Sequence, residues 1–287
     1  MAMPVVSLAH PEYREQYLKS LQVFCSKYNG YEVESDWMKN RLGDILLKNI
    51  SIDKTIHILS VGCGNGIKES SLLEALRGRS VKYTALDSSP EMVLEFQDHV
   101  ISSSRFPDAD FRLFTTTCEE FVELEAKQTY DLIHFIHVAY FIHPMDQLIC
   151  KYVSLLSPGG LLVILCEARD SPLEKVRALT LGVEPISPDI SASLRQLGYE
   201  YWKETVSSYC DISCLYNTES RDVGTTDTDE TDLFLDFLAY VADFSHNFPP
   251  STITKFRDSL RAAAVQKGDK LLLEKPCDAF FVKSKVL

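Results

Sequence analysis

A glycine-rich turn directly after a run of apolar residues is the feature of this sequence that most restricts its fold. Residues 56–61 have the composition of a buried strand, and Gly62, Gly64 and Gly66 follow at alternate positions. Glycine lets the backbone turn sharply from a strand into a helix and leaves amide groups exposed at the helix start. In open α/β sheets, ligands bind at this carboxyl edge of the strands. The G-x-G-x-G spacing is not the G-x-G-x-x-G spacing that seats a dinucleotide, so it predicts either another ligand or a simple tight turn.

An aspartate lies at the corresponding position of the next expected strand. Asp87 follows residues 81–86, and a carboxylate there can accept hydrogen bonds from both hydroxyl groups of a ribose. The alternative is helix capping, because Asp87, Ser88 and Ser89 are all cap-forming residues and Pro90 suits a first helical turn. The glycine loop and Asp87 together favour a cofactor that contains a nucleoside.

Strand-like and helix-like segments alternate from residue 56 to residue 166. This alternation predicts a parallel sheet with helices on both faces. Strands are expected at residues 56–61, 81–86, 110–114, 130–138, 161–166, 199–216 and 271–282, and helices at 70–76, 119–124, 147–156, 173–181, 190–197, 233–244 and 250–265. Two further helices, separated at Asn29, are expected within residues 11–49, and an acidic loop is expected at residues 225–232. We therefore divide the chain into a helical cap (residues 1–50), a cofactor-binding core (51–170) and the remainder of the sheet with substrate-covering helices (171–287).

Charge and cysteine content narrow the class of protein. The net charge of −12 disfavours binding to nucleic acids and to anionic membranes. The eight cysteines form no CxxC pair and several lie in apolar runs, which indicates reduced thiols in a cytoplasmic protein. No apolar run reaches the length that spans a bilayer.

Polar residues also follow the third expected strand. Thr117, Cys118 and Glu119 lie where an adenine ring would bind in a sheet of this kind. The alternative is a capping box before the next helix, and the two roles can coexist.

The end of the fourth expected strand combines an apolar residue with groups suited to a substrate. Ile136 would pack on the cofactor, whereas His137, Tyr140 and Phe141 would face the substrate. His137 and the neighbouring His134 can equally be core groups. We expect no metal site, because no third ligand lies near these histidines in the sequence.

These residues make the chain resemble class I methyltransferases, and in particular the histamine N-methyltransferase family. The resemblance covers nearly the whole chain and includes Tyr17 through Phe24, residues 58–64, Asp131 through His134 with Tyr140, Cys210 through Ser213, and Asp236 through Phe244. It implies a seven-stranded, mostly parallel Rossmann-like sheet with an antiparallel last strand and a helical cap. It also implies S-adenosylmethionine (SAM) as cofactor, S-adenosylhomocysteine as product, a small amine or imidazole as acceptor, and a monomer.

The resemblance assigns roles to residues of this chain by position. The cofactor set is Gly62, Cys63, Gly64, Asp87, Ser88, Met92, Thr117, Cys118, Glu119 and Ile136. The acceptor set is Tyr17, Leu21, Glu32, His137, Tyr140, Phe141 and Phe244, with His137 as the catalytic group and Glu32 or Glu34 as a second acid.

The acceptor half departs from the family pattern. The family's substrate-binding glutamate falls at Gly30, and Glu274-Lys275-Pro276 occupies the region where the family has an asparagine. We therefore expect an acceptor other than histamine. Three further hypotheses stay open: an O-methyltransferase of a small metabolite, an aminopropyl transferase on the same fold, and a SAM-binding protein without catalysis.

Overall fold

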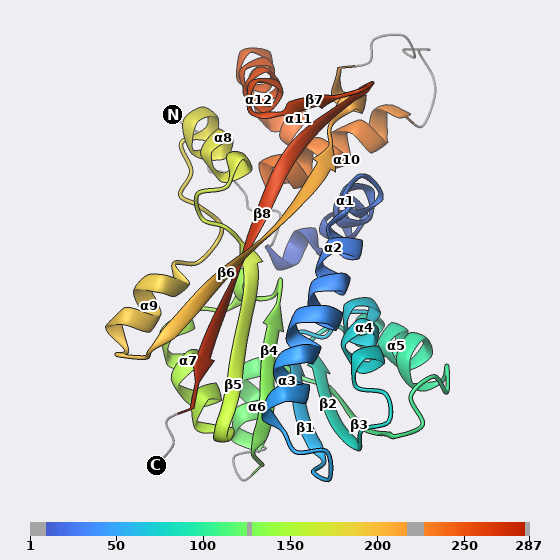
Figure 1. Ribbon diagram of the computed structural model, residues 1–287. Helices are drawn as coiled ribbons and strands as arrows, with labels where there is room; N and C mark the ends of the chain where they lie inside the picture. Colours follow the sequence, from blue (N-terminus) through green and yellow to red (C-terminus); the bar gives the residue numbers. More distant parts are fainter. Residues whose placement is uncertain (1–9, 125–127, 217–226, 285–287) are drawn as a thin grey trace. The chain divides into compact units, whose positions relative to one another are not determined.

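The structure, a computed structural model, describes residues 10–124, 128–216 and 227–284. Its strands are β1 (Ile56–Val61), β2 (Val81–Asp87), β3 (Ala109–Thr115), β4 (Tyr130–Ile136), β5 (Leu156–Glu167), β6 (Tyr201–Asp211), β7 (Val265–Lys267) and β8 (Lys270–Lys283). They form a sheet in the order β3-β2-β1-β4-β5-β8-β6, and β7 pairs with β8 (Figure 1). Strands β1 to β5 are parallel and β8 is antiparallel to β5. The predicted fold class is confirmed, and the short β7 adds one strand to the seven expected.

The helices follow the predicted alternation with the strands. They are η1 (Pro11–Tyr13), α1 (Arg14–Lys27), α2 (Gly30–Trp37), η2 (Met38–Leu42), α3 (Gly43–Asn49), α4 (Ile67–Ala75), α5 (Pro90–Phe96), η3 (Gln97–Ile101), α6 (Cys118–Leu124), η4 (Ala139–Phe141), α7 (Met145–Ser154), α8 (Pro172–Leu181), α9 (Ile190–Gln196), η5 (Ser213–Leu215), α10 (Asp227–Ala239), α11 (Phe244–Asn247) and α12 (Pro250–Ala263). Within the described residues, none of them is long and apolar enough to cross a bilayer.

The chain forms two compact units that interleave along the sequence. The first, called here the sheet unit, contains residues 32–167, 187–206 and 277–287 as far as they are described. The second, the helical unit, contains residues 1–31, 168–186 and 207–276 with the same restriction. Each unit thus consists of separate stretches of chain, whereas the three segments expected from the sequence are consecutive.

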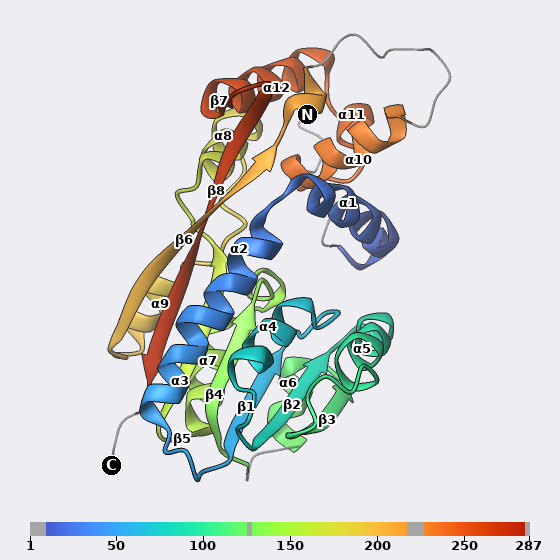
Figure 2. The same cartoon turned by 45° about the vertical axis from the view of Figure 1, so that its right-hand side comes forward.

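Successive residues of the sheet unit's strands belong to different cores, as expected for strands that are buried on both faces. Ile58 and Leu132 belong to the core that also contains Leu72 of α4. Leu59 and Ile133, one residue later in each strand, belong to the core that contains Tyr152 of α7. Figure 2 shows α3 and α4 on the same face of this sheet.

The helical unit has its own apolar core. Its buried members come from α1, α8, α10 and α12 and include Phe24, Leu173, Phe234 and Phe256. This core is separate from the two cores of the sheet unit.

Two predictions in this unit are wrong. Residues 227–232 were expected as loop but form the start of α10, because acidic residues are favourable at a helix N-terminus. Residues 225 and 226 lie outside the described residues. The next helix was expected to continue to Phe244, but α10 ends at Ala239 and Tyr240 has a positive φ of 59°.

Candidate functional site

The glycine loop joins β1 to α4 and is held against the neighbouring strand. The amides of Gly62 and Cys63 both donate to the carbonyl oxygen of Leu86, at 2.8 and 2.9 Å. Gly62, Gly64 and Gly66 have φ values of 69°, 53° and 78°. Residues other than glycine rarely adopt such φ angles, so the three glycines are what allows the chain to turn here.

The surroundings of the loop fit a bound nucleoside cofactor. A Cβ atom at Gly62 would lie 2.5 Å from Cγ2 of Val138, so the turn after β4 packs directly on this glycine. A Cβ atom at Gly64 would meet no atom within 4 Å. The loop therefore presents backbone to open space at Gly64, where a ligand can approach closely.

Asp87 lies at the end of β2 and contacts this loop. Its Oδ2 accepts a hydrogen bond from the amide of Gly64 at 3.0 Å, and its Oδ1 accepts one from the amide of Ser89 at 2.9 Å. The cap of helix α5 is Ser89, whose hydroxyl accepts from the amide of Met92 at 3.3 Å. Asp87 is therefore not the helix cap, and each of its oxygens retains acceptor capacity for a ribose hydroxyl.

The other predicted cofactor residues lie at the same edge of the sheet. The amide of Thr116 donates to the carbonyl oxygen of Asp87 at 3.1 Å, which joins the ends of β2 and β3. Thr117 and Glu120 form the expected capping box, since the amide of Glu120 donates to the Thr117 hydroxyl at 3.2 Å and the amide of Thr117 donates back to the Glu120 carboxylate at 3.2 Å. Cys118 and Glu119 begin α6. Ile136 ends β4 and is buried.

The turn after β4 places a histidine in an unusual backbone conformation. His137 has a φ of 57°, and its amide donates to the carbonyl oxygen of Leu165 at 2.8 Å. Backbone strain at a residue other than glycine costs on the order of 1 kcal/mol and persists where the surroundings enforce it. Its imidazole Nδ1 lies 3.1 Å from the hydroxyl of Tyr140, and that hydroxyl accepts from the amide of Glu167 at 2.6 Å. The imidazole ring is thus held on its Nδ1 side by Tyr140, which is itself held by the end of β5.

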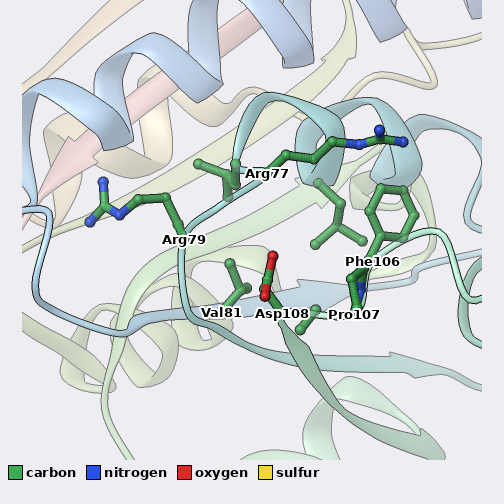
Figure 3. Close-up of a pocket in the computed structure, with 9 residues that line it drawn as sticks. Arg77, Arg79, Val81, Phe106, Pro107 and Asp108 are labelled. Atoms are coloured by element: carbon green, nitrogen blue, oxygen red, sulfur yellow. The ribbon is translucent and has the colours of Figure 1, made fainter.

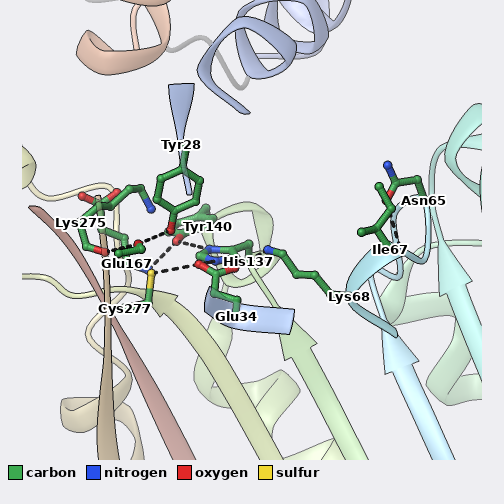
Figure 4. Close-up of polar contacts among 11 residues, drawn as sticks. Tyr28, Glu34, Asn65, Ile67, Lys68, His137, Tyr140, Glu167, Lys275 and Cys277 are labelled. Carbon is green, nitrogen blue, oxygen red and sulfur yellow. Dashed lines mark hydrogen bonds and ion pairs between the residues drawn. The ribbon is translucent and has the colours of Figure 1, made fainter. Parts of the chain in front are cut away.

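A buried carboxylate fixes the other side of this ring. Oε1 of Glu34, on α2, lies 2.9 Å from Nε2 of His137, and Sγ of Cys277, on β8, lies 3.6 Å from the same Oε1 (Figure 4). Oε2 of Glu34 forms an ion pair of 2.5 Å with the ammonium group of Lys68, which follows the glycine loop on α4. The carboxylate is fully buried and Lys68 is 14% exposed. The residues that make these contacts all lie in the sheet unit and are called the Glu34 cluster below: Glu34, Lys68, His137 and Cys277.

The predicted acceptor residues are divided between the two units. Glu32, Phe141, His137 and Tyr140 belong to the sheet unit, where Glu32 and Phe141 are exposed. Tyr17, Leu21 and Phe244 belong to the helical unit. There, Phe244 is fully buried against Phe248 and Phe256, and the half-buried Tyr17 lies against Phe237. Their roles toward an acceptor stay predictions.

His134 has the alternative role considered for it, that of a core group. It is fully buried, its Nε2 lies 3.1 Å from the hydroxyl of Tyr83, and burial lowers its pKa to about 3. The contact of His134 is thus with Tyr83 on β2 and not with the turn that holds His137.

The sequence did not single out Lys68 or Cys277. Cys277 is distant from the glycine loop in the sequence, and no local pattern marks it. Lys68 is adjacent to the loop, and Glu34 is one helical turn after Gly30, the position of the family's substrate-binding glutamate. The sequence already indicates Glu34, beside Glu32, as the second acid, but it does not indicate the partners Lys68 and Cys277.

A small pocket lies elsewhere in the sheet unit. Arg79, Val81, Phe106 and Asp108 are among its lining residues, and it adjoins the amino-terminal ends of β2 and β3 (Figure 3). Ligands of open α/β sheets bind at the carboxyl edge, so this pocket does not serve as the cofactor site.

Comparison with known proteins agrees with this geometry. Residues 35–213 match the methyltransferase domain family. Histamine N-methyltransferase of Danio rerio is 25% identical over 283 residues, which cover 91% of each chain. The Bos taurus protein of the same name is 22% identical and covers 90% of this chain and 91% of its own.

Solved structures support the fold. The plantazolicin methyltransferase BpumL, in complex with a triazolic desmethylPZN analog and SAH, has a TM-score of 0.52 at 15% identity and covers 97% of this chain and 93% of its own. The YcgJ protein of Bacillus subtilis has a TM-score of 0.53 at 10% identity and covers 85% of this chain and 97% of its own. With a family match over more than half of its length and a glycine loop and Asp87 that fit the donor, the chain belongs to the methyltransferase domain family and uses SAM as methyl donor.

Proposed function

We propose that this methyltransferase transfers the methyl group of SAM to an amine or imidazole nitrogen of a small molecule. The observation that carries the proposal is the contact between Glu34 and His137 beside the glycine loop. Similarity to proteins named histamine N-methyltransferase over nine tenths of the chain supports it. The altered position of the acid, Glu34 in place of Gly30, favours an acceptor other than histamine.

The Glu34 carboxylate is suited to hold a cationic nitrogen. A buried carboxylate is costly unless a cation or hydrogen-bond donors compensate it. Here the ammonium of Lys68 does so at 2.5 Å. The ammonium or imidazolium group of an acceptor offers the same charge and the same donor hydrogens, so it can take the place of Lys68.

His137 completes the site by holding the Glu34 carboxylate in place. In the neutral tautomer that carries its proton on Nε2, this atom donates to Glu34 and Nδ1 accepts from the Tyr140 hydroxyl. An acceptor nitrogen needs a free lone pair before transfer, so the bound ammonium must lose a proton. The Glu34–His137 pair provides a base for that proton.

When bound, SAM supplies a methyl group on a positively charged sulfur that leaves readily. The residues of this chain therefore contribute mainly position and exclusion of water. The Gly62–Val138 contact sets the turn of His137 against the cofactor loop. The loop that would hold the donor follows β1, and His137 follows β4. These two strands are adjacent and parallel.

The test is a methyl-transfer screen over primary amines, imidazoles and phenols, read as product mass, followed by variants. We expect turnover of at least one amine or imidazole, and an increase in KM of about tenfold or more in Glu34→Gln, the loss expected for a hydrogen bond to a charged group. Asp36→Asn, on the exposed side of the same helix, is the matched control and should keep KM unchanged. Glu32→Gln tests the other acid that the sequence suggested.

Three results would overturn the proposal. Turnover of phenols alone would indicate an O-methyltransferase, and SAM binding without turnover of any acceptor would indicate a non-catalytic protein. A loss of amine affinity in Glu32→Gln with normal affinity in Glu34→Gln would move the recognition site to the exposed acid.

We also propose a cytoplasmic monomer. None of the eight cysteines, which all lie in the described part of the chain, is in a disulfide bond, and this suits a reducing compartment. The monomer rests on the family resemblance alone, and light scattering of the purified protein tests it.

A further inference from the structure

The Glu34 cluster contains three different metal-binding side chains from distant parts of the chain. Oε1 of Glu34, Nε2 of His137 and Sγ of Cys277 all lie within 4.8 Å of one another. Glu34 and Cys277 are buried, and His137 is partly buried. The sequence predicts no metal, since no third ligand is near His137 along the chain, but folding brings two further ligands to this histidine.

We propose that Glu34, His137 and Cys277 form a binding site for Zn²⁺, and that zinc competes there with the acceptor nitrogen. The site has three protein ligands and one open position. The competition rests on the proposed function, because it assigns Glu34 and His137 to the acceptor. Binding of zinc itself does not depend on that function.

The chemistry of the donor set favours zinc over harder ions. Thiolate and imidazole ligands together select zinc and similar transition metals, whereas calcium and magnesium prefer oxygen ligands. Binding converts the Cys277 thiol to a thiolate and releases its proton to solvent.

The distances are close to those of a tetrahedral site. Ligand atoms at zinc bond lengths of about 2.0–2.3 Å stand roughly 3.4–3.6 Å apart around one ion. Oε1 of Glu34 is 2.9 Å from Nε2 of His137 and 3.6 Å from Sγ of Cys277 (Figure 4). Nε2 of His137 and Sγ of Cys277 lie within 4.8 Å of each other, so shifts on the order of 1 Å would bring the three atoms around one ion.

The surroundings of His137 also match those of a metal ligand. A coordinating imidazole usually donates its other N–H to an oxygen acceptor, which fixes the ring. The Tyr140 hydroxyl lies 3.1 Å from Nδ1 and is itself held by the amide of Glu167. Zinc on Nε2 would move the ring proton to Nδ1, and this proton would then be donated to Tyr140. Lys68 contacts the other oxygen of Glu34, so it need not leave when Oε1 binds the ion.

The test uses the full chain after removal of metals with a chelator. Cobalt(II) is the optical probe, since a tetrahedral cobalt–thiolate site absorbs in the near ultraviolet and in the visible range. We expect one equivalent to bind with both absorptions, zinc to displace it, and the ultraviolet band to disappear in Cys277→Ser. The control is Cys214→Ser, which removes an exposed thiol and should leave the spectrum unchanged.

Zinc should also raise the unfolding temperature of the wild type but not of Glu34→Gln, His137→Gln or Cys277→Ser. His246→Gln, an exposed histidine of the helical unit, is the control for the imidazole. Tyr140→Phe should weaken zinc binding by about tenfold, because it removes the oxygen that orients His137. Retained SAM binding shows that a variant is folded.

X-ray absorption of the zinc-loaded wild type provides a readout without any variant, and one sulfur with nitrogen and oxygen neighbours is expected. A spectrum without sulfur, or a cobalt band lost only in Cys214→Ser, would overturn the proposed site. In kinetics, zinc should inhibit competitively toward the amine and not toward SAM. Zinc binding without that competition would contradict the shared use of Glu34 and His137 while leaving the metal site established.

Discussion

At the scale of single residues, Asp87 links the cofactor loop to the second strand. Its two carboxylate oxygens accept from the amides of Gly64 and Ser89, so the side chain is oriented before any ligand binds. An acceptor held in place loses little conformational freedom on binding. The same side chain can then accept the ribose hydroxyls of SAM.

The first prediction concerns this residue. Asp87→Ala should weaken SAM binding by about 1–3 kcal/mol, because hydrogen bonds to a charged group are lost. This is a loss of roughly 5- to 150-fold, measured by calorimetric titration. Asp110→Ala, an exposed aspartate of β3, is the control. Equal affinities of the two variants would exclude Asp87 from the cofactor site.

The sequence predicts where a residue lies in the fold when that residue follows a strand end, and it predicts this less well elsewhere. Gly62, Asp87 and Thr117 each follow an expected strand, and parallel strands bring their carboxyl ends to one edge. No such rule brings together the residues of the Glu34 cluster. Cys277 and Glu34 meet His137 only through the order of β4, β5 and β8 and the path of α2, which a local pattern does not contain.

At the scale of elements, a substitution in the glycine loop could act in two ways. It could strain the backbone, or it could fill the space that the cofactor needs. Gly64 and Gly182 both have positive φ values, 53° and 66°, and a Cβ atom at either would meet nothing within 4 Å. The backbone cost of alanine is therefore similar at both sites, about 1–2 kcal/mol. Only Gly64 lies in the loop that contacts Asp87.

Gly64→Ala should therefore lower SAM affinity by about tenfold or more, because its methyl group occupies the space through which the cofactor approaches. Gly182→Ala, at the end of α8, should destabilise the protein by a similar amount and leave SAM affinity unchanged. Calorimetric titration and urea unfolding of both variants measure the two effects. The same SAM affinity in both would show that the space at Gly64 is not the cofactor site.

Element boundaries were predicted best where apolar periodicity and a glycine or proline coincide. The strands β1 and β2 lie within one residue of their expected ranges. The start of α10 was missed, because its acidic residues look like a solvated loop when their position at a helix N-terminus is unknown. Polarity alone gave a wrong expectation at residues 227–232, and apolar character alone extended the same helix beyond its end at Ala239.

At the scale of the whole molecule, a buried acid under the cofactor loop couples stability to pH. Glu69, on α4, is 4% exposed and accepts from the hydroxyl of Ser60 at 3.3 Å. Burial raises its pKa to about 7 from a usual value of 4.5. The folded protein therefore keeps this proton in a pH range where the unfolded chain has released it.

The sign of the effect follows from proton binding. Between pH 4.5 and about 7 the folded state binds more protons at this site than the unfolded state, so a rise in pH lowers the free energy of unfolding. The contribution is fully present below pH 4.5 and is lost as the pH passes about 7. A shift of this size corresponds to a loss on the order of 3 kcal/mol.

Glu69→Gln keeps the shape of the side chain and cannot ionise, so this part of the pH dependence should vanish. Urea unfolding at pH 5, 6, 7 and 8 measures it: the stability of the variant relative to the wild type should increase with pH by up to about 3 kcal/mol. Glu200→Gln removes an exposed carboxylate and should follow the wild-type profile. Parallel profiles for the wild type and Glu69→Gln would mean that Glu69 ionises alike in the folded and unfolded chains.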